Sequence, residues 1–211
     1  MDKSTKLNHF IYILIYASIW GFLEATLGWS LQFLAIQVSG FVMFPLAMYI
    51  LLSAYRKLES ARSLVAIGVV AGVIKLVNLL LPGLPPIKTI NPAIALVLEA
   101  SFAALFIPAL MKVKGAARLG FSTLLNLSWR GAFLLTALAI QVLWVIPMGL
   151  LKSGEMIFSY LVVNGLVSSL ITWMIVMIEA RPGLSLSIKL KKPSIWALPL
   201  LAGSVGAQLF L

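Results

Sequence analysis

Apolar stretches of about 20 residues recur along the whole chain and leave little sequence for anything else. A helix of that length crosses the roughly 30 Å hydrocarbon core of a bilayer and satisfies its own backbone polar groups. The 211 residues are 62% hydrophobic and 10% charged, with a mean hydropathy of +1.07, far above a soluble domain. We therefore expect one all-α membrane domain over residues 1–211, with about six transmembrane helices. The spans are predicted at about 10–29, 33–55, 63–82, 92–111, 131–151 and 157–178.

Three segments between or after these spans have a character of their own. The apolar tail at 195–211 is short for a full crossing, so it is predicted as a seventh helix, a re-entrant segment or an interfacial helix. The segment 115–130 is amphipathic and is expected to lie along the cytoplasmic membrane surface. The proline-rich segment 81–92 is predicted to be a stiff outside loop.

Basic residues are divided very unevenly between the two sets of connecting segments. With a cytoplasmic N-terminus, the inside segments hold Lys3, Lys6, Arg56, Lys57, Arg62, Lys112, Lys114, Arg118, Arg130, Arg181, Lys189, Lys191 and Lys192. Only Lys88 and Lys152 fall outside, and Lys75 lies within a span. Since inside loops of membrane proteins are enriched in Lys and Arg, we predict a multi-pass protein of the cell membrane with its N-terminus in the cytoplasm. The first span lacks a clear small-x-small cleavage site and is expected to be retained.

Composition also excludes several classes of chemistry. The chain has no cysteine, which removes disulfides, thiolate nucleophiles and cysteine–zinc sites. The net charge of +10 does not indicate nucleic-acid binding, because the basic segments lack interleaved aromatic residues and inside loops already account for the charge. With one histidine and one aspartate, Asp2 at the terminus, we expect neither a catalytic site, a metal site nor a cofactor.

Three ionisable residues fall inside predicted spans, namely Glu24, Lys75 and Glu99. Each costs about 2.5–3.5 kcal/mol at a helix centre on insertion scales, so such residues mark a function or a packed internal pair. Small residues share their helical faces, which favours a position facing the bundle interior. The helical rise of about 1.5 Å per residue places all three in the outer half of the membrane.

Polar and aromatic residues of the other predicted helices fall near this layer. We interpret the group as the lining of a small-molecule pocket, because such sites are apolar with a few convergent polar groups. The alternative is a Glu–Lys pair that only ties helices together. For the tryptophans the alternative is packing or anchoring at the interface. The predicted binding residues are Trp20, Glu24, Lys75, Asn78, Glu99, Gln141, Trp144 and Asn164.

The first helix carries a stripe of small residues, Ala17, Gly21 and Ala25, at a spacing of four. Together with the segments Trp20–Ala25 and Asn91–Ala100, the length and the six spans, this stripe resembles the substrate-binding S components of energy-coupling-factor (ECF) vitamin transporters. The resemblance implies a vitamin-like substrate bound in an outward-opening pocket and separate ATPase subunits that hydrolyse ATP. It also implies that Ala17, Gly21 and Ala25 dock a transmembrane coupling subunit, while the alternative for such a stripe is helix packing within the protein. The apolar tail at 195–211 departs from the family pattern.

The sequence thus favours a substrate-binding subunit of an uptake transporter, without catalytic activity. If Lys75 offsets one carboxylate, the other is left for an amine, so the expected substrate is a small cationic or zwitterionic molecule. One alternative is a proton-coupled secondary transporter that uses Glu24 or Glu99. A lipid-modifying enzyme and a scaffold protein without a ligand are the others. Membrane lipids are expected partners in every case.

Overall fold

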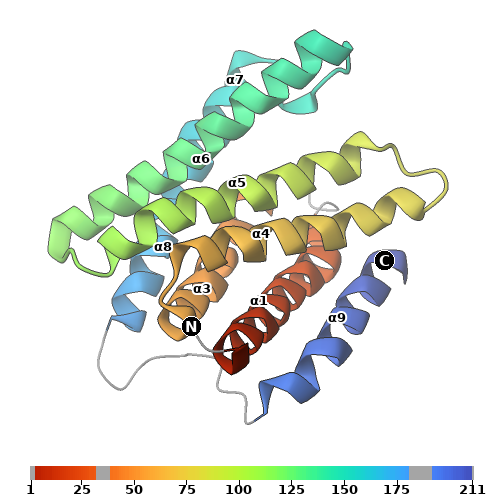
Figure 1. Cartoon of the computed structure of the whole chain (residues 1–211). Helices are drawn as coiled ribbons and strands as arrows, with labels where there is room; N and C mark the ends of the chain where they lie inside the picture. Colours follow the sequence, from red (N-terminus) through yellow and green to blue (C-terminus); the bar gives the residue numbers. More distant parts are fainter. Residues whose placement is uncertain (1–2, 32–38, 181–191, 211) are drawn as a thin grey trace.

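The computed structural model describes residues 3–31, 39–180 and 192–210, and this part of the chain is built from helices joined by short turns (Figure 1). A π-helical turn interrupts two of the membrane helices, at Glu24–Gly28 and at Ser159–Val163. Short 3₁₀ turns lie at Val77–Leu80 and Gly149–Leu151. The α-helices are α1 (Lys3–Leu23), α2 (Trp29–Leu31), α3 (Ser39–Leu58), α4 (Ala61–Leu76), α5 (Ile87–Leu110), α6 (Gly115–Trp144), α7 (Gly154–Phe158), α8 (Asn164–Glu179) and α9 (Pro193–Phe210).

Within the described ranges, seven helical stretches are long and apolar enough to cross a membrane. The predicted all-α membrane bundle is confirmed, and the chain is a multi-pass membrane protein. The C-terminal tail supplies the seventh stretch, because α9 has 18 residues and rises about 27 Å at 1.5 Å per residue. That length is close to the thickness of the hydrocarbon core.

The expectation of a surface helix at 115–130 is wrong. These residues form the first half of α6, one continuous helix of 30 residues that includes the predicted span from 131. Arg118, Ser122, Asn126 and Arg130 follow one another at a spacing of four, and all are buried. In this helix the polar face is turned toward the protein, whereas the amphipathic pattern suggested a face turned toward water. A bundle in lipid places polar groups inside, since hydrocarbon cannot hydrogen-bond to them.

Two other boundaries differ from the prediction. Helix α5 begins at Ile87, so the second half of the predicted outside loop is helical. Pro86 occupies its N-cap position, and the missing N–H of a proline costs least at a helix start. Helix α6 ends at Trp144, because the next residue, Val145, has a φ of 55° and leaves the helical conformation. The predicted start of the second span, at 33, lies outside the described residues.

Several helices of the bundle pack closely against one another. Helices α4 and α5 run side by side, and α9 lies along α1 (Figure 1). Gly68 of α4 sits against α5 so tightly that a Cβ atom there would lie 2.9 Å from the carbonyl oxygen of Leu96. Trp20, Phe44 and Trp129 belong to the main buried apolar cluster. The core therefore joins α1, α3, α5 and α6 around their middle sections.

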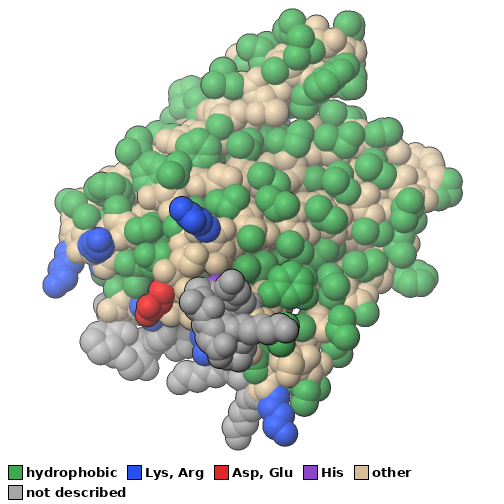
Figure 2. Space-filling view, in the orientation of Figure 1, with side chains coloured by type: hydrophobic (Ala, Val, Ile, Leu, Met, Phe, Trp, Pro, Cys, Tyr) green, Lys and Arg blue, Asp and Glu red, His purple; other side chains and the backbone are tan. Residues whose placement is uncertain are grey.

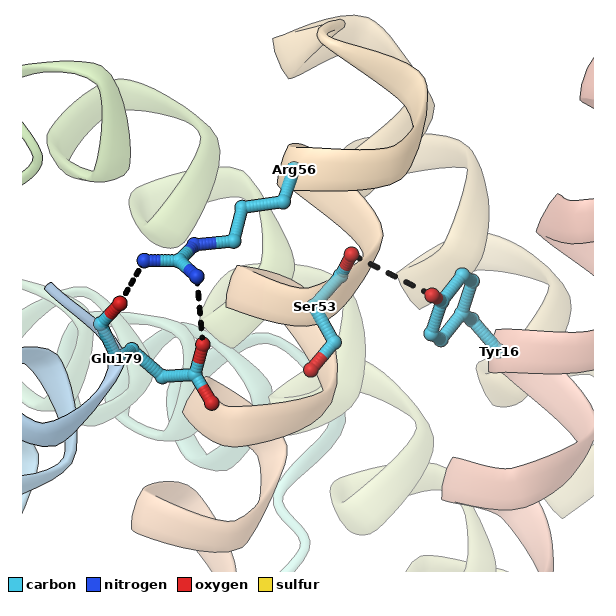
Figure 3. Close-up of polar contacts among 4 residues, drawn as sticks. All are labelled: Tyr16, Ser53, Arg56 and Glu179. Atoms are coloured by element: carbon cyan, nitrogen blue, oxygen red, sulfur yellow. Dashed lines mark hydrogen bonds and ion pairs between the residues drawn. The ribbon is translucent and has the colours of Figure 1, made fainter. Parts of the chain in front are cut away.

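Charge is concentrated at one end of the molecule. In Figure 2 the visible Lys and Arg side chains lie in the lower left half of the view, and the upper right of this face is mostly apolar. The same end holds an ion pair, in which the Arg56 Nη1 atom of α3 lies 3.1 Å from Glu179 Oε2 of α8 (Figure 3). The Tyr16 hydroxyl of α1 donates to the Ser53 carbonyl oxygen at 3.3 Å. Helices α1 and α8 are thus both attached to α3 near the basic end.

Candidate functional site

A cavity of about 200 Å³ opens between α1, α3, α5, α6 and the helical stretch that contains α7 and α8. It lies toward the end of the bundle where α3 and α5 begin, which is opposite the basic end. Two carboxylates, one amide and three aromatic rings contribute to a lining that is otherwise apolar. Its residues are Glu24, Gly40, Met43, Asn91, Pro92, Ala95, Leu96, Glu99, Trp129, Phe133 and Tyr160.

Both π-helical turns contribute a residue to this cavity. Glu24 is the first residue of one turn, and Tyr160 is the second residue of the other. A π-helical turn inserts an extra residue into an α-helix, and such turns occur frequently at functional sites. Gly28, at the end of the first turn, leaves room for the acid group of Glu24, since a Cβ atom there would lie 3.1 Å from Glu24 Cδ. The two interruptions therefore change the local geometry of the helices where these side chains line the cavity.

Glu24 and Glu99 give the cavity its polar character. Glu99 is only 7% exposed, although it lies in the middle of α5 and in an apolar helix. Across the described ranges the structure has one ion pair, Arg56–Glu179, so neither cavity carboxylate is neutralised by a direct salt bridge. Glu99 interacts electrostatically with Glu24 and with Arg130. The cavity thus contains two acid groups that form no ion pair with the described residues.

Three aromatic side chains from α6 and from the π-helical turn before α8 form one wall. The ring of Tyr160 lies 6.3 Å from that of Trp129, edge to face, and 6.1 Å from that of Phe133. Phe44 of α3 packs behind the tryptophan with a centroid distance of 5.0 Å. Such aromatic contacts hold the rings in fixed orientations. The three rings therefore support one another along this side of the cavity.

Arg130 lies behind this wall and is fully buried. Its Nη2 atom donates to the carbonyl oxygen of Gly40 at 2.5 Å and to Ser168 Oγ at 2.8 Å, and its Nη1 atom donates to Asn126 Oδ1 at 3.0 Å. The guanidinium carbon lies 4.4 Å from the ring centroid of Trp129. The distribution of basic residues in the sequence predicted Arg130 in a cytoplasmic segment and gave no indication of this buried position. The available signal was its place at the end of the polar row of α6, at a spacing of four from Asn126.

Of the eight predicted binding residues, the structure brings Glu24 and Glu99 to the same cavity. Asn164 is close to its rim, because its Nδ2 atom lies 3.7 Å from where a Cβ atom of Gly40 would be. Trp20 is buried in the apolar core and is not part of the lining. Two of the predicted acids therefore line the cavity, and one predicted amide lies beside it.

The other four predicted residues lie elsewhere. Lys75 faces α9, where its Nζ atom donates to Gln208 Oε1 at 3.4 Å. Asn78 lies in the 3₁₀ turn Val77–Leu80 and does not line the cavity. Gln141 accepts a hydrogen bond from the Met148 backbone N–H beyond the end of α6. Trp144 is 65% exposed at the end of α6. The expectation that these residues share one pocket is wrong, because an equal depth in the membrane does not determine which interhelical space a side chain enters.

The small-residue stripe of α1 is covered within the chain itself. Ala17, Gly21 and Ala25 are all buried. A Cβ atom on Gly21 would lie 2.7 Å from Ser204 Oγ of α9 and 3.0 Å from the side chain of Ile74 on α4. The stripe therefore packs against α4 and α9 at Gly21, and docking of a coupling subunit at this position would require α9 to move.

No group of three or more metal-ligating side chains occurs in the described part of the chain. The cavity combines two carboxylates with a largely apolar and aromatic lining. The arrangement is instead suited to a molecule with a positive group and an apolar or aromatic body. No protein-family model, curated protein or solved structure matches this chain.

Proposed function

We propose that this protein is the substrate-binding membrane subunit of an uptake system for a small cationic or zwitterionic molecule. The observation that carries the proposal is the cavity itself, in which neither Glu24 nor Glu99 has a Lys or Arg of the described residues at salt-bridge distance. Glu99 is buried and Glu24 is half-buried. An unpaired carboxylate in such surroundings is costly, so two of them in one mostly apolar cavity are best explained by a cationic ligand.

The chemistry of the wall agrees with such a ligand. Trp129, Phe133 and Tyr160 line the cavity, and cations are attracted to aromatic rings by about 0.5–2 kcal/mol. A ring in the ligand would add apolar contact with the same wall. The substrate class is therefore a small aromatic amine or a related heterocycle, within a cavity of about 200 Å³.

The direction of uptake follows from the charge distribution. The cavity lies toward the end where α3 and α5 begin, whereas the exposed Lys57, Arg62 and Lys112 lie at the opposite end. Under the positive-inside rule the basic end is cytoplasmic. The site would then face the outside of the plasma membrane, as expected for capture of an external nutrient.

Energy for transport would come from separate subunits, as the resemblance to ECF S components implies. The sequence has no Walker motif, so ATP hydrolysis requires a partner. The α1 stripe around Gly21 is the proposed docking surface, and α9 would be displaced when the coupling subunit binds.

A proton-coupled secondary transporter is the second candidate. It is favoured by one observation, namely that Glu24 and Glu99 line the same cavity and interact electrostatically. Two interacting carboxylates can exchange a proton for a cationic substrate. Uptake into vesicles that contain this protein alone, driven by a proton gradient, would support the second candidate over the first.

The first experiment is a thermal-stability screen of the purified protein in detergent. Matched aromatic compounds with a cationic, zwitterionic, neutral or anionic group are compared for the wild type and for Glu99→Gln. A specific ligand at 100 times its Kd stabilises the folded state by about 2.7 kcal/mol. We expect stabilisation by cationic or zwitterionic compounds in the wild type alone. No stabilisation by any compound, with a lower melting temperature of Glu99→Gln, would favour the scaffold alternative.

A further inference from the structure

Among the described residues, Lys75 is a buried cation without a carboxylate at salt-bridge distance. It is 5% exposed, and its Nζ atom donates to the neutral amide of Gln208. An ammonium group in an apolar environment is strongly attracted to a nearby carboxylate, since the low dielectric constant strengthens the interaction. A contact within the protein must therefore hold the Lys75 ammonium group away from the acid groups of the cavity.

Glu24 is the acid group that interacts electrostatically with Lys75, across the packed surface of α1 and α4. Gly21, one turn before Glu24, touches Ile74, the residue before Lys75. The charges of Glu24 and Lys75 interact electrostatically, and Glu99 on α5 is the other acid near Glu24. A change in the conformation of the Lys75 side chain can therefore bring its ammonium group toward Glu24.

Helix α9 holds Lys75 in its present position. The Gln208 side chain is 1% exposed and uses both ends of its amide, because Nε2 donates to the Gly21 carbonyl oxygen at 3.0 Å while Oε1 accepts from Lys75. Ser204, one turn earlier on α9, packs against Gly21. The amide is thus fixed in one orientation, with its acceptor atom toward Lys75.

We propose that Gln208 sets the charge of the cavity by holding the Lys75 ammonium away from the Glu24 carboxylate. With α9 in place, both cavity acids are available to a cationic ligand. When α9 leaves α1, Lys75 pairs with Glu24, so that only Glu99 remains for the cation and the ligand is released. This regulation rests on the proposed function of the cavity, and it couples ligand affinity to the position of α9.

The test uses no ligand, so it can fail independently of the proposed function. Dicyclohexylcarbodiimide labels protonated carboxyl groups in apolar surroundings, and a carboxylate paired with an ammonium stays ionised and reacts slowly. Labelling rates at Glu24 and Glu99 are measured by mass spectrometry of the full-length protein in detergent. The variants are Gln208→Leu, Lys75→Met, the double variant, and Gln141→Leu as a matched control on α6.

We expect Glu24 to be labelled in the wild type and in Gln141→Leu, and about tenfold more slowly in Gln208→Leu, because Lys75 then pairs with it. The double variant should regain the wild-type rate, since it has no ammonium at position 75. Labelling of Glu99 should change by less than about twofold throughout. An unchanged rate in Gln208→Leu, no recovery in the double variant, or an unlabelled Glu24 in the wild type would overturn the proposal. Equal changes at Glu24 and Glu99 would show general loosening of α9 and would also overturn it.

Discussion

Arg130 on α6 and Ser168 on α8 are joined by a hydrogen bond of 2.8 Å between Nη2 and Oγ, in a buried part of the bundle. The same guanidinium group also binds Gly40 and Asn126, so it connects three helical segments behind the aromatic wall of the cavity. A buried arginine that makes several hydrogen bonds gives this wall a fixed position. It acts on the cavity through Trp129, whose ring it contacts.

Replacement of Arg130 by Met should destabilise the fold by about 2–4 kcal/mol, because buried acceptors of Gly40, Asn126 and Ser168 lose their donor. Arg130→Lys should recover only part of this loss, since one ammonium lacks the planar fork of a guanidinium. Denaturant unfolding in detergent measures both effects. The exposed Arg62 provides the control, and Arg62→Met should change stability by less than about 0.5 kcal/mol. Equal effects at the two positions would show that the Arg130 network is not structural.

Substitution of Gly68 tests the close contact of α4 with α5. Gly68→Ala should lower the free energy of unfolding by about 1–3 kcal/mol, because the added methyl group overlaps Ala100 and approaches the Leu96 carbonyl oxygen. Gly120 on α6 is the matched control, since a Cβ atom there meets no other atom within 4 Å. Gly120→Ala should leave stability unchanged or raise it by up to about 1 kcal/mol, as alanine favours a helix. A stable Gly68→Ala variant would contradict this packing.

The orientation of the chain can be tested by single-cysteine labelling, because the sequence contains no cysteine. Lys114→Cys should react with a membrane-impermeant maleimide only after the cell membrane is opened, whereas Lys88→Cys should react in intact cells. Phe210→Cys, at the end of α9, should also react in intact cells if seven helices cross the membrane. Protection of Phe210→Cys together with labelling of Lys88→Cys would show that α9 does not cross.

Much of the fold could be predicted from the sequence, because the length and hydropathy of a membrane span follow from the thickness of the bilayer. The approximate spans and the membrane class needed no tertiary information. The ends of the helices were harder to predict. The start of α5 depends on the positions of nearby prolines. The start of α6 depends on whether its polar face contacts protein or water. A single sequence does not distinguish these two environments.

The site was only partly predictable for a geometric reason. Glu24 and Glu99 were identified because acids are rare in apolar helices, and both line the cavity. Lys75 is at a similar depth but faces α9, and this choice depends on the order in which helices pack around one another. Arg130 was missed because a basic residue near a predicted boundary was counted as a loop residue. Tyr160 was missed because an aromatic residue in an apolar span carries no signal of its own.

If Glu24 and Glu99 bind a cationic ligand, the cavity should prefer a positively charged compound to a neutral one of the same shape. Equilibrium binding of phenethylammonium and of its neutral analogue 2-phenylethanol should be measured on the wild type, Glu24→Gln, Glu99→Gln and Glu155→Gln, the last being an exposed acid outside the cavity. We expect the wild type and Glu155→Gln to bind the cation at least about tenfold more tightly than the neutral compound, a difference of about 1.4 kcal/mol. Each cavity variant should lose most of that preference. Equal binding of the two compounds by the wild type, or a preference that survives both Glu24→Gln and Glu99→Gln, would contradict the account.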